Sequence, residues 1–512
     1  MGFFNKKQKS QAKQQSKQQE LYISDKLDEN LSRVKEILGN PTDLVIRKFT
    51  VRSTNMQCAI IYIDGLVNDD LIQSNVVKNV QLVTERKQLP EKPKQLLRVI
   101  YENIISATIV KTVKTLDELF NGLLYGDTIF LLDGVDFVLD IGTKGWEGRQ
   151  IEEPVSEGVI RGPREGFVEN LQTNIMLVRR NIRDPNLRFD EYQIGRRSKS
   201  NLVVSYVAGI IHPELLQEIN RRLQTIDMDD APDTGFIEEW LQDSFLSPFP
   251  QITSTERPDK VAAALLQGKV AILLDGTPFV LIAPTTLGNA LQSPEDYYER
   301  WTIATLTRLL RYLAAFIAIF MPALYIALLS YQPGMLPTKL TFSIAASREG
   351  VPFPPFVEAL MMVITMELLR EAGARLPKTI GQTIGIVGGL VIGDAAVSAG
   401  IVSPVMVVII ALNAVASFSI PEYSLGISFR IILLGFMIAA GVLGLYGIIL
   451  AYIMVNIHIV NLRSVGVPYS APFGPFFPKD WKDLVVRAPI PTINQRPVYM
   501  QTKDKKSGNK GG

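Results

Sequence analysis

The sequence predicts an α/β soluble N-terminal half, made of two related subdomains, followed by an all-α polytopic membrane domain. Two observations lead to this fold class. Apolar residues are concentrated after residue 312, in stretches that approach the roughly 20 residues a helix needs to cross a hydrocarbon layer. Before residue 290, short apolar strands alternate with amphipathic helical stretches, and one such unit occurs twice.

The chain begins with a basic stretch that lacks the features of a folded segment. Residues 1–19 contain five lysines and no acidic side chain, and we expect residues 1–24 to form a disordered tail. The start has no apolar core of the kind found in secretory signals. Residues 25–40 then place leucines and a valine at helical spacing, and Gly39-Asn40-Pro41 stops the pattern, which predicts an amphipathic helix.

An internal repeat organises the soluble half. LLYGDTIFLLDGVDFVLDI (123–141) matches LLQGKVAILLDGTPFVLIA (265–283), with ten identities at an offset of 142. A buried apolar strand, an Asp-Gly turn and a second strand predict a β-hairpin in each copy. We therefore expect α/β subdomains at 25–141 and 167–290, joined by a linker at 142–166 that is rich in glycine, proline and charge.

The sequence of the second half predicts membrane helices. Residues 291–312 predict an amphipathic interfacial helix, since tyrosines and a tryptophan precede the first span, as they do in aromatic belts. Residues 313–462 are predicted to form the transmembrane domain, and 463–512 a cytoplasmic C-terminal tail. An even number of spans places both ends on one side, and the basic tail favours the cytoplasm. The expected full spans are 313–331, 380–402, 404–420 and 431–460, with a break at Ser403-Pro404.

One shorter segment carries most of the charge. At 15 residues, 356–370 is too short for an independent span, and we expect a re-entrant or pore-facing helix. Glu358 and Glu367 are nine residues apart, on opposite faces of a helix, so they cannot form an acid/base pair. Glu367 can pair with Arg370, and Glu371 with Arg375. For Glu358, helix capping and cation coordination are both open.

Glycines and a few polar residues follow in an otherwise apolar stretch. Their spacing as two GxxxG motifs is typical of closely packed membrane helices. The alternative is a helix that lines or gates a conduit, and the sequence does not decide between the two. The glycines are Gly381, Gly385, Gly389 and Gly393, and the candidate polar lining is Gln382, Thr383 and Asp394.

Several function classes are excluded by what the sequence lacks. It contains no Walker A, GxSxG, HExxH or CxxC pattern, so we expect no enzyme and no cofactor. One cysteine, Cys58, and two distant histidines, His212 and His458, argue against a metal site built from cysteine or histidine ligands. The two ends of the chain are basic and the part between them is acidic. Nucleic-acid binding requires a basic face on a folded domain, which this distribution does not provide. Basic ends suit tails that lie at an anionic membrane leaflet, or tails that are solvated and have no partner.

A series of motifs runs from about 120 to 475, and it comprises DGVDFVLDIGTKGWEGR, RGPREGFVENLQTN, SPEDYYERW, VPFPPFVEAL, ELLREAGARLPKTIGQTIGIVGGLVIGDAAVSAGIVSP and RSVGVPYSAPFGP. Through this series the chain closely resembles the A subunit of the GerA-type spore germination receptors, and the resemblance carries several expectations. It implies a multi-pass protein of the spore inner membrane, with its N-terminal domain and tail on the core side. It also implies a permease-like B subunit and a lipoprotein C subunit as partners.

The resemblance further implies a homo-oligomeric ring, for which a pentamer is one size it suggests, around a cation-conducting pore. The channel hypothesis takes Glu358, Glu367, Gln382, Thr383, Val387 and Asp394 as pore or gating candidates. Val363 departs from the family pattern, which usually has an acid there. The alternative hypothesis is a membrane-anchored relay subunit whose duplicated α/β module recognises a small molecule.

Overall fold

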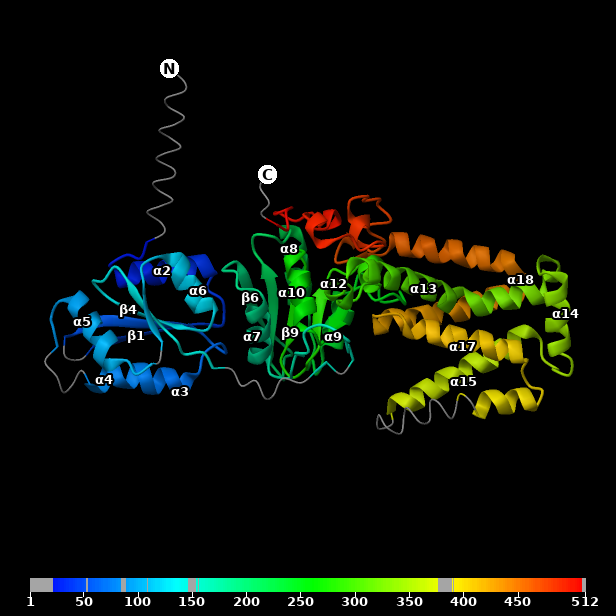
Figure 1. The fold of residues 1–512 in the computed structure, drawn as a ribbon, viewed down its shortest axis with the longest axis horizontal. Coiled ribbons are helices and arrows are strands. Elements are labelled where there is room, and N and C mark those ends of the chain that lie inside the picture. Colours follow the sequence, from blue (N-terminus) through cyan, green and yellow to red (C-terminus); the bar gives the residue numbers. More distant parts are fainter. Residues whose placement is uncertain are drawn as a thin grey trace, which may run out of the picture.

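The computed structural model describes residues 22–51, 54–83, 89–107, 109–145, 153–154, 156–375, 389 and 391–508. Figure 1 shows three parts in a row along the longest axis: a first α/β subdomain, a second one and a helical half. The predicted fold class is confirmed.

The first subdomain is built on a five-stranded antiparallel sheet of order β1-β2-β4-β5-β3. Strand β2 has apolar side chains on both faces, since Cys58 and Ile60 belong to one core cluster and Ala59 and Ile61 to the other. Helices therefore cover both faces. The strands are β1 (Leu44–Val51), β2 (Met56–Ile63), β3 (Val110–Val113), β4 (Thr128–Leu132) and β5 (Val138–Ile141), with α2 (Leu27–Leu38), α3 (Asp69–Leu71), α4 (Lys78–Val83), α5 (Pro93–Val99) and α6 (Leu116–Leu124).

The second subdomain repeats this plan. Its sheet has the order β6-β7-β9-β10-β8, which is the same order as in the first copy. The predicted duplication is therefore present in the strand topology. The strands are β6 (Leu187–Ile194), β7 (Ser200–Val207), β8 (Thr253–Thr255), β9 (Val270–Leu274) and β10 (Val280–Ala283), and the helices are α7 (Leu171–Asn181), α8 (Pro213–Gln224), α9 (Thr234–Leu241), α10 (Pro258–Leu266), α11 (Leu287–Ala290) and α12 (Glu295–Tyr298).

The repeated Asp-Gly turn explains why the motif is kept in both copies. Asp133 accepts a hydrogen bond of 3.0 Å from the backbone N–H of Leu27, at the start of α2. Asp275 accepts the equivalent bond of 3.1 Å from Leu171, at the start of α7. Because the first N–H groups of a helix have no partner within it, each aspartate both shapes a hairpin and caps a helix.

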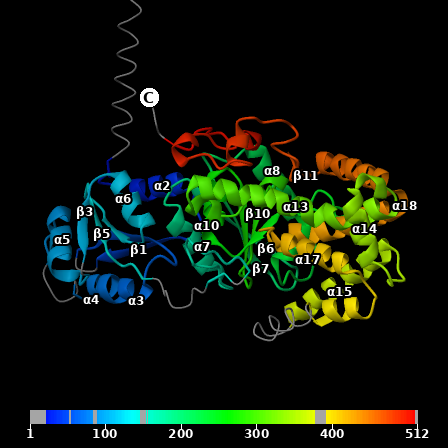
Figure 2. The ribbon, with the colours of Figure 1, turned by 45° about the vertical axis from the view of Figure 1, so that its right-hand side comes forward.

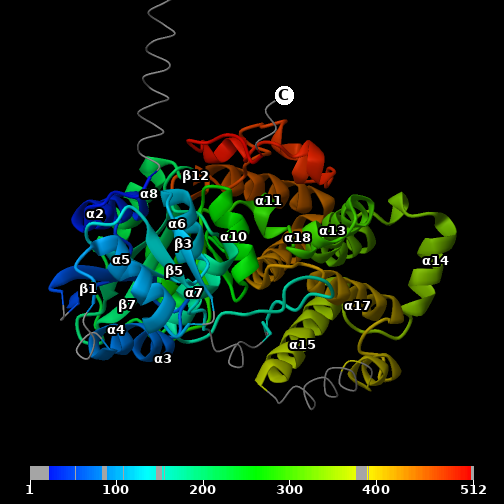
Figure 3. The same cartoon turned by 60° about the vertical axis from the view of Figure 1, so that its left-hand side comes forward.

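The helical half contains α13 (Trp301–Ser330), α14 (Thr338–Ser347), α15 (Pro355–Arg375), α17 (Pro404–Phe418) and α18 (Tyr423–Asn461). Helix α13, of 30 residues, runs without a break from the expected interfacial segment into the expected first span. Between α13 and α15, helix α14 lies at the end of the bundle far from the soluble half (Figure 3). The expected break at Ser403-Pro404 is confirmed, since α17 begins there.

The expected single long helix at 431–460 is wrong, because α18 folds back on itself. Gly444 has φ 60° and ψ −141°, which is not helical. Ser428 donates a hydrogen bond to the carbonyl of Pro248, and His458 Nε2 lies 2.8 Å from Ser247 Oγ. In a straight helix Ser428 and His458 would be about 45 Å apart, yet they contact adjacent residues. The helix is therefore a hairpin with its tip at Gly444.

Two described helices, α13 and α18, are long and apolar enough to cross a membrane, with mean hydropathies of 2.3 and 2.4. Each arm of the α18 hairpin is about 26–31 Å long at 1.5 Å per residue. Both arms pack on α13, where the Phe320 ring contacts Phe436 in one arm and Tyr452 in the other. These features fit membrane association.

The C-terminal segment after α18 packs on the second subdomain (Figures 1 and 2). Tyr499 and Met500 are buried in the same core cluster as Leu281 of β10. A short hairpin of β11 (Arg463–Ser464) and β12 (Val467–Pro468) begins the segment. The chain thus leaves α18 at the end of the bundle where it entered α13, and residues 463–508 form part of the soluble body.

Candidate functional site

Several of the predicted site residues lie outside the described residues. These are Gly381, Gly385, Gln382, Thr383 and Val387.

The rest of the glycine-rich stretch is described. Gly393 is buried, and an added Cβ there would lie 3.5 Å from Val407 of α17, in ordinary van der Waals contact. Gly389 has open space where a Cβ would point. Asp394 is exposed.

Glu358 is fully buried where three helices meet. Its Oε2 accepts a hydrogen bond of 3.0 Å from the backbone N–H of Ser403, the residue that caps α17. Its Oε1 lies 2.7 Å from Nη2 of Arg348, the residue that follows α14. The carboxylate therefore joins the start of α15 to the start of α17 and the end of α14. This partnership with the cap of another helix was not visible in the local sequence.

Glu367 forms the second charged cluster, toward the other end of α15. Arg370 Nη1 lies 2.7 Å from its Oε1, which confirms the predicted i,i+3 pair, and Arg430 of α18 lies 3.4 Å away. Arg370 also contacts Ser417 at 3.4 Å and stacks over the Phe418 ring. The cluster thus joins α15 to both neighbouring helices.

A further charged pair of α15 lies beyond Glu367, at the C-terminal end of the helix. Glu371 and Arg375 are ion-paired at 2.6 Å, as predicted, and both are exposed. Val363 is buried in the helical core. The Glu358 side chain has no exposed area, whereas that of Glu367 is 41% exposed, so the two carboxylates are on different faces, as expected.

A cleft of about 490 Å³ lies between the two subdomains. Asp64 and Asp69 line it from the first subdomain, and Glu169 and Thr173 from the second. Burial, together with Asp64 and Asp70, raises the pKa of Asp69. The cleft is therefore acidic and suited to a cationic or amine-bearing group.

The parts that form this cleft are held firmly together. Arg179 of α7 donates hydrogen bonds of 3.0 and 2.9 Å to Asp43, just before β1, and both side chains are completely buried. One hydrophobic cluster also runs through both subdomains, from Ile23 to Ile282. The geometry favours a preformed cleft over one that opens by a hinge between the subdomains.

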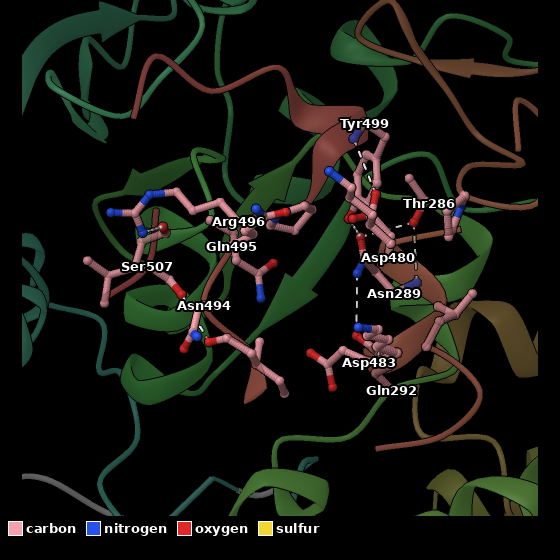
Figure 4. Close-up of a pocket in the computed structure, with 18 of the residues that line it drawn as sticks. Thr286, Asn289, Gln292, Asp480, Asp483, Asn494, Gln495, Arg496, Tyr499 and Ser507 are labelled. Carbon is pink, nitrogen blue, oxygen red and sulfur yellow. Dashed lines mark hydrogen bonds between the residues drawn. The ribbon is translucent and has the colours of Figure 1, made fainter. Parts of the chain in front are cut away.

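A larger cavity of about 640 Å³ lies between the C-terminal segment and the second subdomain. Figure 4 shows Asn494, Gln495 and Arg496 on one side and the Asn289–Tyr499 contact on the other. Asn289 Oδ1 accepts hydrogen bonds of 2.9 Å from Tyr499 and from buried Lys269. Burial, with a smaller contribution from Lys260, lowers the pKa of Lys269 to about 7.

Beside this cavity, a buried ion-pair network ties the C-terminal segment to α13. Arg308 Nε lies 2.9 Å from Asp296 and its Nη1 3.3 Å from Asp483. Arg311 shares Asp296 at 3.0 Å, and Tyr297 donates a hydrogen bond of 2.8 Å to Asp483. Because Asp483 is far away in sequence, no local pattern could have indicated this link.

Within the described ranges, no group of three or more histidine, cysteine, aspartate or glutamate side chains could hold a metal ion.

Comparisons with known proteins agree over almost the whole length. The family model "Bacillus/Clostridium GerA spore germination protein" matches residues 32–499. The chain is 48% identical to spore germination protein GerLA of Bacillus cereus, covering 94% of this chain and 97% of that one. It is 42% identical to spore germination protein KA of Bacillus subtilis (96% and 90%), and 40% to the uncharacterized membrane protein YfkQ (96% and 93%).

Among solved structures, the chain resembles the N-terminal domain of the A subunit of the Bacillus megaterium spore germinant receptor GerK3. The identity is 33%, the TM-score 0.42, and the match covers 51% of this chain and 96% of that domain.

Proposed function

Because this chain belongs to the Bacillus/Clostridium GerA spore germination protein family, we propose that it is the A subunit of a nutrient germinant receptor in the spore inner membrane. It triggers germination as part of an oligomeric, nutrient-gated cation channel. Its receptor also contains a permease-like B subunit and a lipoprotein C subunit. The soluble half and the C-terminal segment lie together on the core side.

The position of the charges on α15 is the observation that carries this proposal. Glu358 and Glu367 are about 14 Å apart along the helix, whereas the hydrocarbon layer is about 30 Å thick. If α15 crosses the bilayer, at least one of them lies at membrane depth. Ionisable groups at that depth are costly and mark ion pathways more often than lipid-facing surfaces.

An oligomeric ring gives these side chains a surface to face. Glu367 keeps 41% of its side chain exposed after α15 has packed on its own neighbours. Figures 1 and 3 show α15 at the edge of the bundle beside α17. In a ring of subunits, one such residue per chain becomes a ring of charges, as in cation-selective filters. Buried Glu358 then positions α15 against α17 behind this lining.

The test is nutrient-dependent potassium efflux from liposomes that contain the receptor with its proposed partners. Glu367→Gln is expected to change the rate or the ion preference of efflux, and Thr383→Ala and Val387→Ala to change its gating. Glu371→Gln is the matched control, because Glu371 is exposed and its ion pair with Arg375 lies within its own helix. If nutrient causes no efflux, or if all the variants behave like the control, α15 and the glycine-rich stretch do not form the conduit.

A second candidate function rests on the cleft between the subdomains. In this version the acidic cleft itself recognises a small amine-bearing germinant, and the helical half anchors the module and relays the signal. Asp64→Asn with Asp69→Asn would then weaken nutrient binding by the intact chain, measured by calorimetry without the partner subunits. If the double variant binds nutrient as the wild type does, or if the wild type shows no binding, the cleft hypothesis is refuted and only the channel proposal remains.

A further inference from the structure

The loop between α9 and β8 presents two large apolar side chains to solvent. Phe245 is 85% exposed and Leu246 83%, although most apolar residues of the soluble half are buried. A side chain this exposed makes almost no contact with its own chain. A neighbouring pair of them is a surface that needs a partner.

The loop is rigid rather than loose. The buried Gln251 side chain accepts hydrogen bonds from the backbone N–H groups of Asp243 and Ser244, at 2.8 and 3.0 Å, and donates one of 2.6 Å to the carbonyl of Ser244. Asp243 is itself paired with Arg222 at 2.7 Å. The base of the loop is therefore fixed by hydrogen bonds, so that Phe245 and Leu246 stay exposed. Asp243, the acidic side chain nearest to them in the sequence, is paired with Arg222.

The far side of the loop is fixed to the membrane helices. Ser247 Oγ lies 2.8 Å from His458 Nε2, the Phe249 ring stacks on the same imidazole, and the carbonyl of Pro248 accepts the Ser428 hydroxyl hydrogen. Ser428 and His458 lie near the two ends of the α18 hairpin that face the soluble half. They are about 21–24 Å from its tip at 1.5 Å per residue.

This distance sets the level of the loop. An arm of 21–24 Å covers most of a hydrocarbon layer of about 30 Å, and the α18 arms become polar here, with Arg430 in one and Asn456 and Asn461 in the other. We propose that Phe245 and Leu246 insert into the lipid interface on the side of the soluble half, as a second anchor beside the helices. Apolar and aromatic side chains favour this layer. The inference rests on the membrane placement proposed above.

The full chain, reconstituted in vesicles of phosphatidylethanolamine and phosphatidylglycerol, tests this insertion with spin labels. Cys58 is the only cysteine and is buried, so Cys58→Ala gives a background for single cysteines at Leu246, Ile109 and Ile438. Ile109 is 57% exposed in the first subdomain and is the matched water-facing control, and Ile438, 55% exposed in α18, is the membrane reference. Collision with oxygen and with a water-soluble nickel chelate reports the surroundings of each label.

The label at 246 should gain oxygen collisions and lose nickel-chelate collisions relative to the label at 109, as a lipid-embedded label does. Strong nickel-chelate collisions at 246, with 438 protected, would overturn the loop proposal alone. Weak collisions with both reagents at 246 would mean that a second protein surface covers the loop, which also overturns it. If the label at 438 is itself open to the nickel chelate, the membrane placement fails first.

Discussion

The buried ion pair between Asp43 and Arg179 offers the sharpest test of how the two subdomains are joined. Asp43→Asn keeps the shape of the side chain but leaves the Arg179 charge buried without a counter-ion. Because neither side chain has any exposed area, solvent cannot screen the loss. We expect it to cost about 3–5 kcal/mol, the range for breaking one side of a buried pair.

Hydrogen exchange in the intact chain measures this cost. At 1.4 kcal/mol per factor of ten, amides of β2 and α7 that exchange by subdomain opening should exchange roughly a hundred- to a few-thousand-fold faster. The double variant Asp43→Asn/Arg179→Met should recover much of the loss, since removing both charges leaves no buried ion. The control is Arg164→Gln, which breaks a solvent-exposed pair with Glu153 and should change little.

Two results would refute this reasoning. If Asp43→Asn accelerates exchange no more than Arg164→Gln, the ion pair does not hold the subdomains together. If the double variant is worse than the sum of its single changes, the two side chains do not act as a pair of opposite charges.

Three further changes test other parts of the structure. Gly444→Ala puts a side chain at positive φ in the hairpin tip, which costs about 1–3 kcal/mol and should lower the melting temperature in detergent. Gly435→Ala is the control, because a Cβ at Gly435 would point into open space, and it should not lower the melting temperature. Burial and Asp127 raise the pKa of Asp140 to about 6. As the pH rises, the unfolded chain loses the Asp140 proton near pH 4, whereas the folded state keeps it until about pH 6. The free energy of unfolding therefore decreases as the pH rises from about 4 to 6. Asp140→Asn should therefore stabilise the first subdomain at pH 7 but not below pH 4, by hydrogen exchange. Asp483→Ala should weaken docking of the C-terminal segment by about 1–3 kcal/mol, seen as faster tryptic cleavage there than in the wild type.

Much of the soluble half could be predicted because its signals are local and repeated. The Asp-Gly turns gave both hairpins, and the fixed offset gave the duplication that the strand order confirms. The partners of Asp133 and Asp275 were missed, because a cap supplied from another part of the fold leaves no pattern near the helix.

In the helical half, apolar composition hid the turns. The run around Gly444 contains no proline or polar cluster, so it predicts one long helix, although a single glycine suffices for the reversal. The surroundings of Glu358 were equally hidden, because Arg348 and Ser403 come from segments that only packing brings together. The basic composition of the tail likewise gave no sign that Tyr499 and Met500 are core residues.

The docking of the C-terminal segment has a consequence for how the protein is made. Leu281, Tyr499 and Met500 share one core cluster, and the entire helical half lies between them in the chain. During synthesis the second subdomain therefore stays incomplete until the entire helical half has been made. Its last core residues, Tyr499 and Met500, are made only after α18. A chain that lacks residues 499 and 500 is left with an incomplete core in its second subdomain, so folding of this subdomain depends on a segment that lies beyond the whole helical half.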